Sequence, residues 1–272
     1  MKTKVIMIAS SKGGVGKSTA ALGIARQLAF AGESVLLCDL DFGNACLDIL
    51  LGLEDRVIYT VSDIASGRCK AGDAVIGDGD TGVPGLSLIP CPAGGNVNIS
   101  KFGEGSSLAA SAVVRAAKAA AKEAEASFVI VDTGAGVNPV TDAAAGWADT
   151  VLVVASHNPI SLRAAEGTVA RMNEKGIKDI RLVVNSFEAE ATIKRRGSRK
   201  GLLDIIDMSR APLAGVVPYD YSLMLFHEGL SVKGSREADA AFRNIAHRLM
   251  GEDVPIFEGI NKIRKRRKKL YQ

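Results

Sequence analysis

Near its start, the chain places a glycine-rich segment between an apolar run and a helical pattern. Residues 5–9 are typical of a buried strand, and the helical pattern covers residues 17–31, before Gly32. Glycines between the two allow backbone N–H groups to converge on phosphate oxygens, and the start of a helix adds a favourable dipole. The segment therefore predicts a phosphate-binding loop that joins a strand to a helix.

Individual side chains of this loop suit a nucleotide with Mg²⁺. Lys17 should reach the β- and γ-phosphates, Ser18 offers a hydroxyl to Mg²⁺, and Thr19 is placed to touch the α-phosphate. We expect ATP and Mg²⁺ as the ligands. The predicted nucleotide-binding residues of the loop are Ser11, Lys12, Gly13, Gly14, Val15, Gly16, Lys17, Ser18 and Thr19.

Short apolar runs alternate with helical patterns along the rest of the chain. Further strands are expected at 34–38, 86–89, 128–131, 150–155, 181–185 and 214–217, further helices at 107–126, 160–174, 202–208 and 235–250, and a loop at 77–85. Continuous apolar strands separated by helices are typical of a parallel sheet covered on both faces. The sequence predicts a doubly wound, mostly parallel α/β sheet flanked by helices, of the P-loop NTPase type. One ATPase domain should cover residues 1–254.

Acidic side chains follow two of the expected strands. Asp39 and Asp41 come at the end of one strand, and Asp132 ends another. Transfer of a phosphoryl group to water requires carboxylates near the metal and a polar group that orients the water. We therefore expect Ser18, Asp39 and Asp132 at Mg²⁺.

The loop departs from the common phosphate-loop pattern, because Ser11 stands in place of the first glycine and Lys12 is an additional lysine. In this respect it resembles the deviant loop of the MinD/ParA family of ATPases. The resemblance implies an ATP-bound homodimer in which Lys12 reaches the nucleotide of the partner subunit. It also implies that Asp41 lies beside the attacking water, so Lys12 and Asp41 would be the catalytic residues of a Mg²⁺-dependent ATPase.

The resemblance extends to the base site and to most of the chain. It implies that Asn185, Pro218 and Asp220 contact the adenine. Residues 42–53 and 241–255 are similar to the MinD and FlhG branch. That branch implies spatial control of cell division at the septum, with a MinC-like division inhibitor and an ATPase-stimulating protein as partners. A ParA-like partition ATPase that binds DNA and a FlhG-like regulator of flagellar number are the alternatives.

The four cysteines are too widely spaced for the iron–sulfur and nickel-insertion relatives of this family. They fit reduced thiols in a cytosolic protein. No apolar run of the sequence approaches the length needed to span a bilayer.

Residues 255–272 form a basic tail. They hold seven Lys and Arg against one Glu, so the rest of the chain has a net charge of −2 although the whole has +4. Apolar residues at helical spacing and cations on the other face favour an amphipathic helix on an anionic membrane. We expect a cytoplasmic protein, peripheral on the inner face of the cell membrane, whose dimer binds better than one copy. A disordered solubilising tail, nucleic-acid attachment and docking to another protein are the alternatives. The predicted membrane residues are Ile256, Phe257, Ile260, Ile263, Lys265, Arg266 and Leu270.

Overall fold

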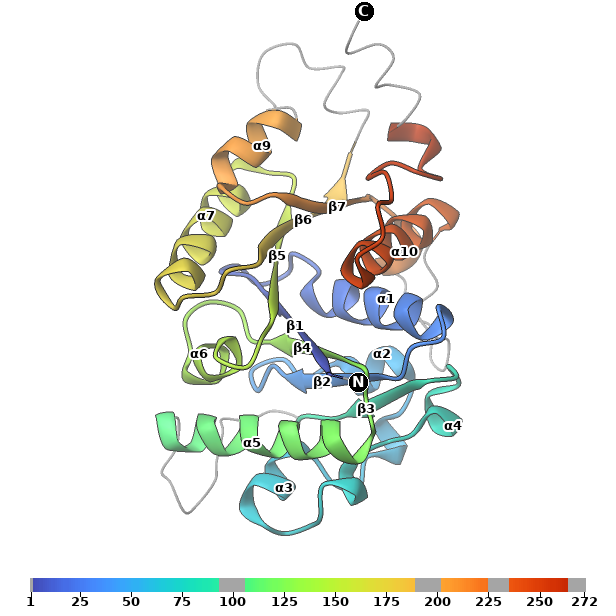
Figure 1. Cartoon of the computed structure of the whole chain (residues 1–272), viewed down its shortest axis with the longest axis vertical. Coiled ribbons are helices and arrows are strands. Elements are labelled where there is room, and N and C mark those ends of the chain that lie inside the picture. Colours follow the sequence, from blue (N-terminus) through green and yellow to red (C-terminus); the bar gives the residue numbers. More distant parts are fainter. Residues whose placement is uncertain (1, 93–105, 189–201, 225–234, 264–272) are drawn as a thin grey trace, which may run out of the picture.

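A sheet of seven parallel strands forms the centre of the molecule in the computed structural model, which describes residues 2–92, 106–188, 202–224 and 235–263 (Figure 1). The strand order is β3-β2-β4-β1-β5-β6-β7, and each neighbouring pair is parallel. This confirms the predicted doubly wound sheet. The strands are β1 (Lys4–Ala9), β2 (Val35–Leu40), β3 (Leu86–Ile89), β4 (Phe128–Thr133), β5 (Thr150–Ser156), β6 (Ile180–Phe187) and β7 (Leu213–Pro218).

Helices cover both faces of the sheet. Figure 1 shows α1 and α10 on one face and α6, α7 and α9 on the other, while α5 packs beside α6. The strands are almost entirely buried, as their apolar composition predicts. The longer helices are α1 (Lys17–Phe30), α5 (Ser107–Glu123), α6 (Pro139–Ala145), α7 (Pro159–Glu174), α9 (Leu202–Ser209) and α10 (Arg236–Met250).

The sequence missed the short elements. Four short helices, α2 (Leu47–Leu51), α3 (Val61–Ser66), α4 (Asp78–Thr81) and α6, and three single turns of 3₁₀-helix, at 54–56, 72–74 and 221–224, were not expected. The expected loop at 77–85 was wrong in part, because it contains α4. Elements of this length are shorter than the stretch over which helical periodicity can be recognised.

The carboxyl ends of β1, β2 and β4 lie side by side at one edge of the sheet. β4 pairs with both β1 and β2, and Asp132 is in register with Ile8 on one side and Asp39 on the other. In open α/β sheets, ligands bind outside this edge. The three loops that follow these strands are therefore brought together by the topology.

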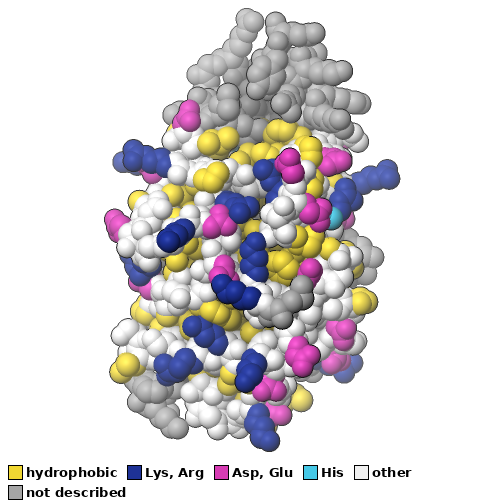
Figure 2. Space-filling model, viewed as in Figure 1, with side chains coloured by type: hydrophobic (Ala, Val, Ile, Leu, Met, Phe, Trp, Pro, Cys, Tyr) yellow, Lys and Arg dark blue, Asp and Glu magenta, His cyan; other side chains and the backbone are white. Residues whose placement is uncertain are grey.

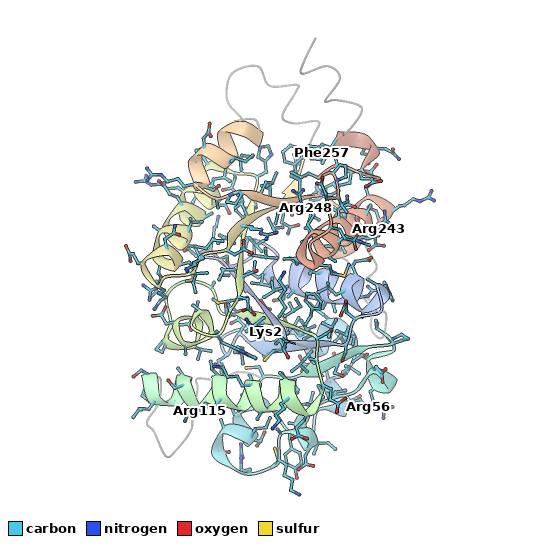
Figure 3. All side chains as sticks on the ribbon, in the orientation of Figure 1. Lys2, Arg56, Arg115, Arg243, Arg248 and Phe257 are labelled. Carbon is cyan, nitrogen blue, oxygen red and sulfur yellow. The ribbon has the colours of Figure 1, made fainter. Side chains whose placement is uncertain are left out.

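The chain continues to pack on the domain after residue 254. Asn244 Nδ2 of α10 donates a hydrogen bond to the carbonyl of Glu258 at 2.8 Å, and Ile260 (0% exposed) and Ile263 are buried in the core. The boundary predicted at 254/255 is therefore wrong for the described part of the tail, because the folded unit extends to Ile263. Figure 3 labels Phe257 at the end of the molecule where α10 carries Arg243 and Arg248.

Candidate functional site

The glycine-rich loop connects β1 to α1 as predicted. Gly16 precedes α1 with a left-handed backbone (φ +87°), and the first turn of the helix contains no acidic residue, which suits an anion at this end. A Cβ on Gly16 would lie 2.1 Å from Asn185 Nδ2. Glycine is therefore required here both by conformation and by the close approach of β6.

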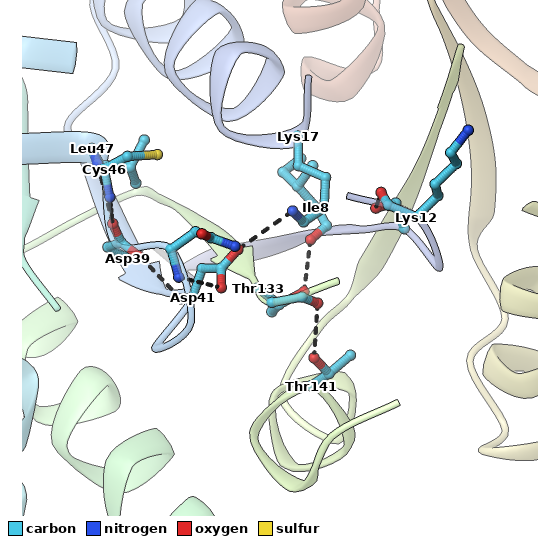
Figure 4. A network of polar contacts seen from close by, with 12 residues as sticks. Ile8, Lys12, Lys17, Asp39, Asp41, Cys46, Leu47, Thr133 and Thr141 are labelled. Atoms are coloured by element: carbon cyan, nitrogen blue, oxygen red, sulfur yellow. Dashed lines mark hydrogen bonds and ion pairs between the residues drawn. The ribbon is translucent and has the colours of Figure 1, made fainter. Parts of the chain in front are cut away.

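Lys17, the first residue of α1, faces Asp41 beyond the end of β2. Lys17 Nζ lies 3.5 Å from Asp41 Oδ2, and both side chains are buried (Figure 4). The other oxygen of Asp41 accepts a hydrogen bond from the backbone N–H of Asn44 at 3.2 Å. The carboxylate that the family resemblance predicts to be catalytic is thus held directly beside the lysine that is expected to bind phosphate.

Asp39 shapes the loop that carries Asp41. Its Oδ1 accepts the N–H of Asp41 at 2.9 Å, and its Oδ2 accepts those of Cys46 and Leu47 at 3.1 and 3.2 Å. Burial, followed by the charge of Asp132, raises the pKa of Asp39 to about 7. Both carboxylate oxygens are occupied by backbone amides, so Asp39 anchors the loop before α2. This differs from the place at the metal that we predict from the sequence.

Asp132 differs from Asp39 in how its carboxylate oxygens are used. It is 0% exposed, and neither carboxylate oxygen has a well-formed hydrogen bond within the described part of the chain, although the Ser18 hydroxyl and the Thr133 amide lie close enough to lower its pKa. Burial raises the pKa of Asp132 to about 6, while the nearby charge of Lys17 lowers it. A buried carboxylate with free oxygens fits a cation or its bound water.

The described residues contain no cluster of three or more His, Cys, Asp or Glu side chains that could hold a metal by themselves. Mg²⁺ is commonly bound by one or two carboxylates together with substrate phosphates and water. Asp132, with Ser18 at the start of α1, is therefore a donor set that fits Mg²⁺ together with a nucleotide.

The loop after β4 is tied to the phosphate loop. The N–H of Gly136 donates to the carbonyl of Ser10 at 2.9 Å, and Thr133 Oγ1 donates to the carbonyl of Ile8 at 2.9 Å. A Cβ on Gly134 would approach Asp41 Oδ1 to 3.2 Å, so this loop also lies against Asp41. Asn138 then caps α6 by accepting the N–H of Thr141.

A cavity of about 300 Å³ adjoins the phosphate loop and contains all three residues predicted to bind adenine. Asn185 is buried, however, and its Nδ2 donates to the carbonyl of Val15 at 2.8 Å. The residue therefore braces the phosphate loop as well as lining the cavity. The sequence missed Ser186, Tyr219 and Leu223 in this wall.

The pairing of β6 with β7 explains why Ser186 was missed. Its register shifts between Val184 and Phe187, and Ser186 has a positive φ of 52°. A bulge of this kind re-aims side chains next to a site, and regular alternation along a strand does not reveal it.

Lys12 lies apart from the buried cluster. Its side chain is exposed and has no polar partner among the described residues, and Figure 4 shows it pointing away from Lys17 and Asp41. Within one copy of the chain, Lys12 therefore does not take part in the site that Lys17, Asp41 and Asp132 form.

Comparison with known proteins supports the family resemblance that the phosphate loop suggests. Residues 6–230 match the CobQ/CobB/MinD/ParA nucleotide binding domain. The septum site-determining protein MinD of Synechocystis is 30% identical over 279 residues, which cover 97% of this chain and 98% of that protein. The chain belongs to the MinD branch of the CobQ/CobB/MinD/ParA family. Members of this family are nucleotide-binding ATPases.

Solved structures place the chain closer to MinD than to partition proteins. The MinC:MinD cell division protein complex of Aquifex aeolicus is 29% identical with a TM-score of 0.77, covering 93% of this chain and 98% of that chain. MinD of Pyrococcus horikoshii, complexed with Mg-ADP, is 21% identical with a TM-score of 0.73 and coverages of 93% and 100%. A putative plasmid partition protein of Borrelia burgdorferi, bound to AMPPNP, is 16% identical with a TM-score of 0.68 and coverages of 93% and 100%. The last two share the fold alone, and the nearer relatives indicate a MinD-like septum-site ATPase.

The predicted membrane residues of this MinD-family chain are distributed differently from a lipid-facing stripe. Ile260 and Ile263 are buried in the core, and Ile256 and Phe257 are partly buried against it. The prediction that these four side chains face lipid was therefore wrong for this conformation, because the domain itself covers them. Lys265, Arg266 and Leu270 lie outside the described residues. Among the helices that the structure describes, none has both the length and the apolar character of a membrane span.

Proposed function

We propose that this chain is an ATP-driven switch of the MinD type, which binds ATP with Mg²⁺, closes into a homodimer and hydrolyses ATP to ADP and phosphate. The observation that carries the proposal is the grouping of Lys17 and Asp41 with the fully buried carboxylate of Asp132 beside a glycine-rich loop. A structural ion pair between Lys17 and Asp41 would not account for a second carboxylate, Asp132, that is fully buried without a well-formed hydrogen bond in the described chain.

Each residue has a distinct task in this proposal. The amides at the start of α1 and the Lys17 ammonium bind the β- and γ-phosphates, and Ser18 and Asp132 hold Mg²⁺, whose charge offsets that of the phosphates. When Lys17 binds phosphate, its pairing with Asp41 weakens, and the Asp41 carboxylate becomes available to orient the attacking water. The ion pair between Lys17 and Asp41 would thus be present in the nucleotide-free site and broken in the nucleotide-bound site.

The exposed side chain of Lys12 supports the proposal of a homodimer. Its ammonium is exposed and unpaired in the described chain, although it belongs to the phosphate loop. A cation in this position contributes to hydrolysis when it reaches the phosphates of a second subunit, where it stabilises the negative charge of the transition state.

The proposed place of action is the inner face of the cell membrane. The basic run from Arg264 to Lys269 suits an anionic surface, and two copies in a dimer would bind more tightly than one. The face drawn in Figure 2 carries Lys and Arg side chains interspersed with Asp and Glu, rather than one continuous basic surface. A MinC-like division inhibitor and an ATPase-stimulating protein are the proposed partners, by similarity to MinD of Aquifex aeolicus, which was solved with MinC.

The test measures hydrolysis, oligomeric state and surface binding together. Purified protein should form a dimer with ATP and Mg²⁺ but not with ADP, and should sediment with anionic liposomes in the presence of ATP. Neutral liposomes and duplex DNA are the controls. ATP-dependent binding to DNA without binding to lipid would favour the ParA-like alternative, and absence of any ATP-dependent dimer would contradict the proposal.

A further inference from the structure

A hydrogen bond between two hydroxyl groups joins the phosphate loop to α7. Ser11 Oγ and Thr168 Oγ1 lie 2.5 Å apart, although the residues are 157 positions apart in the sequence. Thr168 is 5% exposed and comes from the face of α7 that packs on the sheet. The contact therefore joins the residue directly before Lys12 to a buried position on a long helix.

The direction of this hydrogen bond follows from the other contact of Thr168. Thr168 Oγ1 donates its one hydrogen to the carbonyl of Ala164 at 3.1 Å, one turn earlier in α7. A hydroxyl has a single donor, so Ser11 donates to Thr168. The Ser11 side chain is thus directed toward α7.

Two more hydrogen bonds hold the same stretch of backbone. Ser10 Oγ donates to the carbonyl of Lys12 at 2.8 Å, and the carbonyl of Ser10 accepts the N–H of Gly136 at 2.9 Å. The backbone on the N-terminal side of Lys12 is therefore held from three directions: by its own loop, by the loop after β4 and by α7. In contrast, the Lys12 side chain has no polar partner among the described residues.

The helix at the other end of this contact is itself held in place. Arg171, one turn after Thr168, forms two hydrogen bonds with Asp142 of α6, at 3.1 and 2.6 Å. Lys175 Nζ lies 3.2 Å from the same carboxylate. Because α6 follows the loop that contains Gly134 and Gly136, α7 connects that loop to the residue before Lys12.

We infer that Thr168 is a positioning residue, which acts through Ser11 to hold the backbone at Lys12 so that the lysine side chain projects out of the loop toward a second subunit. The inference rests on the proposed function. A lysine side chain has many rotamers. Fixing its backbone limits the positions that the ammonium can occupy, so less entropy is lost when it binds the phosphates of a second subunit. A displacement of about 1 Å in a catalytic group is enough to lower a rate strongly.

The test uses variants that change one hydroxyl at a time. Thr168→Val keeps the branched shape and removes the acceptor, Thr168→Ser keeps the acceptor, and Ser11→Ala removes the donor. Ser111→Ala is the matched control, because Ser111 Oγ also donates to a carbonyl one turn earlier, in α5, without reaching the phosphate loop. For each variant, kcat, KM for ATP, ATP-dependent dimerisation, ADP affinity and Tm are measured.

Thr168→Val and Ser11→Ala should each lower kcat by about 3- to 30-fold, as expected for a lost hydrogen bond that positions a charged group. KM for ATP and ADP affinity should change less than twofold. Thr168→Ser and Ser111→Ala should keep the kcat of the unchanged protein, and the double variant Ser11→Ala with Thr168→Val should lose no more than either single one.

The opposing outcomes separate this inference from the proposed function. If the protein without substitutions dimerises and hydrolyses ATP, and Thr168→Val is equally active, only the role of Thr168 is overturned and the proposed function stands. Equal losses of ADP affinity and kcat in Thr168→Val would overturn it too, since they would indicate a general disturbance of the loop. An unchanged protein that shows neither dimer nor hydrolysis would overturn the proposed function and this role together.

Discussion

Lys17 Nζ and Asp41 Oδ2 lie 3.5 Å apart, and both side chains are buried beneath the phosphate loop. In the proposed function, the same ammonium binds the phosphates of the nucleotide. One cation therefore serves two anions, the carboxylate in the structure described and the phosphates in the proposed complex.

Lys17→Met should weaken Mg-ADP binding by about 100-fold or more, because a charge-assisted contact to phosphate is lost while the aliphatic stem is kept. It should also lower the free energy of unfolding of the nucleotide-free protein by about 1–3 kcal/mol, since Asp41 would remain buried without its cation. Calorimetry with Mg-ADP and urea denaturation measure the two effects. Adding Asp41→Asn should restore part of the stability and none of the binding; an unaltered dissociation constant for Lys17→Met would contradict the assignment.

Asp41→Ala should retain ATP, lower kcat by about 100-fold or more and accumulate the dimer, because the water would no longer be oriented while the phosphate contacts remain. Size-exclusion chromatography with ATP and Mg²⁺, combined with a phosphate-release assay, measures both. The exposed Asp207→Ala, on α9, is the matched control. A protein with Asp41→Ala that stays monomeric with ATP would argue against the role given to Asp41.

Asp132→Asn should stabilise the nucleotide-free protein at pH 8. The folded pKa of Asp132 is raised to about 6, whereas the unfolded value is that of an ordinary Asp, so the native state binds the extra proton between them. The free energy of unfolding therefore falls as pH rises through this interval, and the carboxylate costs about 1–3 kcal/mol above it. Asparagine removes this cost.

Urea denaturation of both proteins from pH 4 to pH 8 checks the sign. The difference in stability between Asp132→Asn and the unchanged protein should grow with pH over this range. Mg²⁺ should strengthen nucleotide binding less in the variant, because one ligand oxygen is no longer charged. A difference that shrinks as pH rises would show that the Asp132 carboxylate is stabilised, rather than destabilised, in the folded protein.

Gly16→Ala should lower the free energy of unfolding by about 1–3 kcal/mol and weaken nucleotide binding, since a Cβ meets Asn185 and the backbone stays in the left-handed region. The distance to Asn185 Nδ2 would be 2.1 Å. Combining it with Asn185→Ala should recover the part due to the clash. Thermal unfolding and calorimetry measure the pair, and full recovery would mean that the positive φ has no cost here.

Ile260→Ser should lower the free energy of unfolding by about 2–4 kcal/mol, because it leaves a cavity and buries a hydroxyl. A lipid-facing stripe predicts instead an unchanged stability with reduced liposome binding. Ile58→Ser, at a position 81% exposed, is the control and should change the stability by less than about 0.5 kcal/mol. Urea denaturation without lipid distinguishes the two expectations.

Local patterns predicted the strands and the phosphate loop well. Apolar runs identified all seven strands to within two residues, because buried parallel strands are continuously apolar. The order of Lys17, Asp41 and Asp132 along the chain also indicated one site, since parallel strands end at the same edge of a sheet.

The sequence could not show which surface an apolar stripe covers. Ile256, Ile260 and Ile263 recur with helical spacing, which is the same for a helix on lipid and for a segment on its own domain. It also could not show that both carboxylate oxygens of Asp39 accept hydrogen bonds from backbone amides, or that Asn185 donates to the carbonyl of Val15. These contacts depend on how loops from different strands meet.

The burial of Ile263 has a consequence for the cations that follow it. Arg264 is the next residue in the sequence, so the residue directly before the basic run is fixed to the domain wall. In the proposed function, an anionic surface that binds this run would therefore be held close to the wall that contains Ile263, and this would limit the tilt of the whole molecule. In a homodimer, the distance between the two runs would then be decided by how the two bodies pack together.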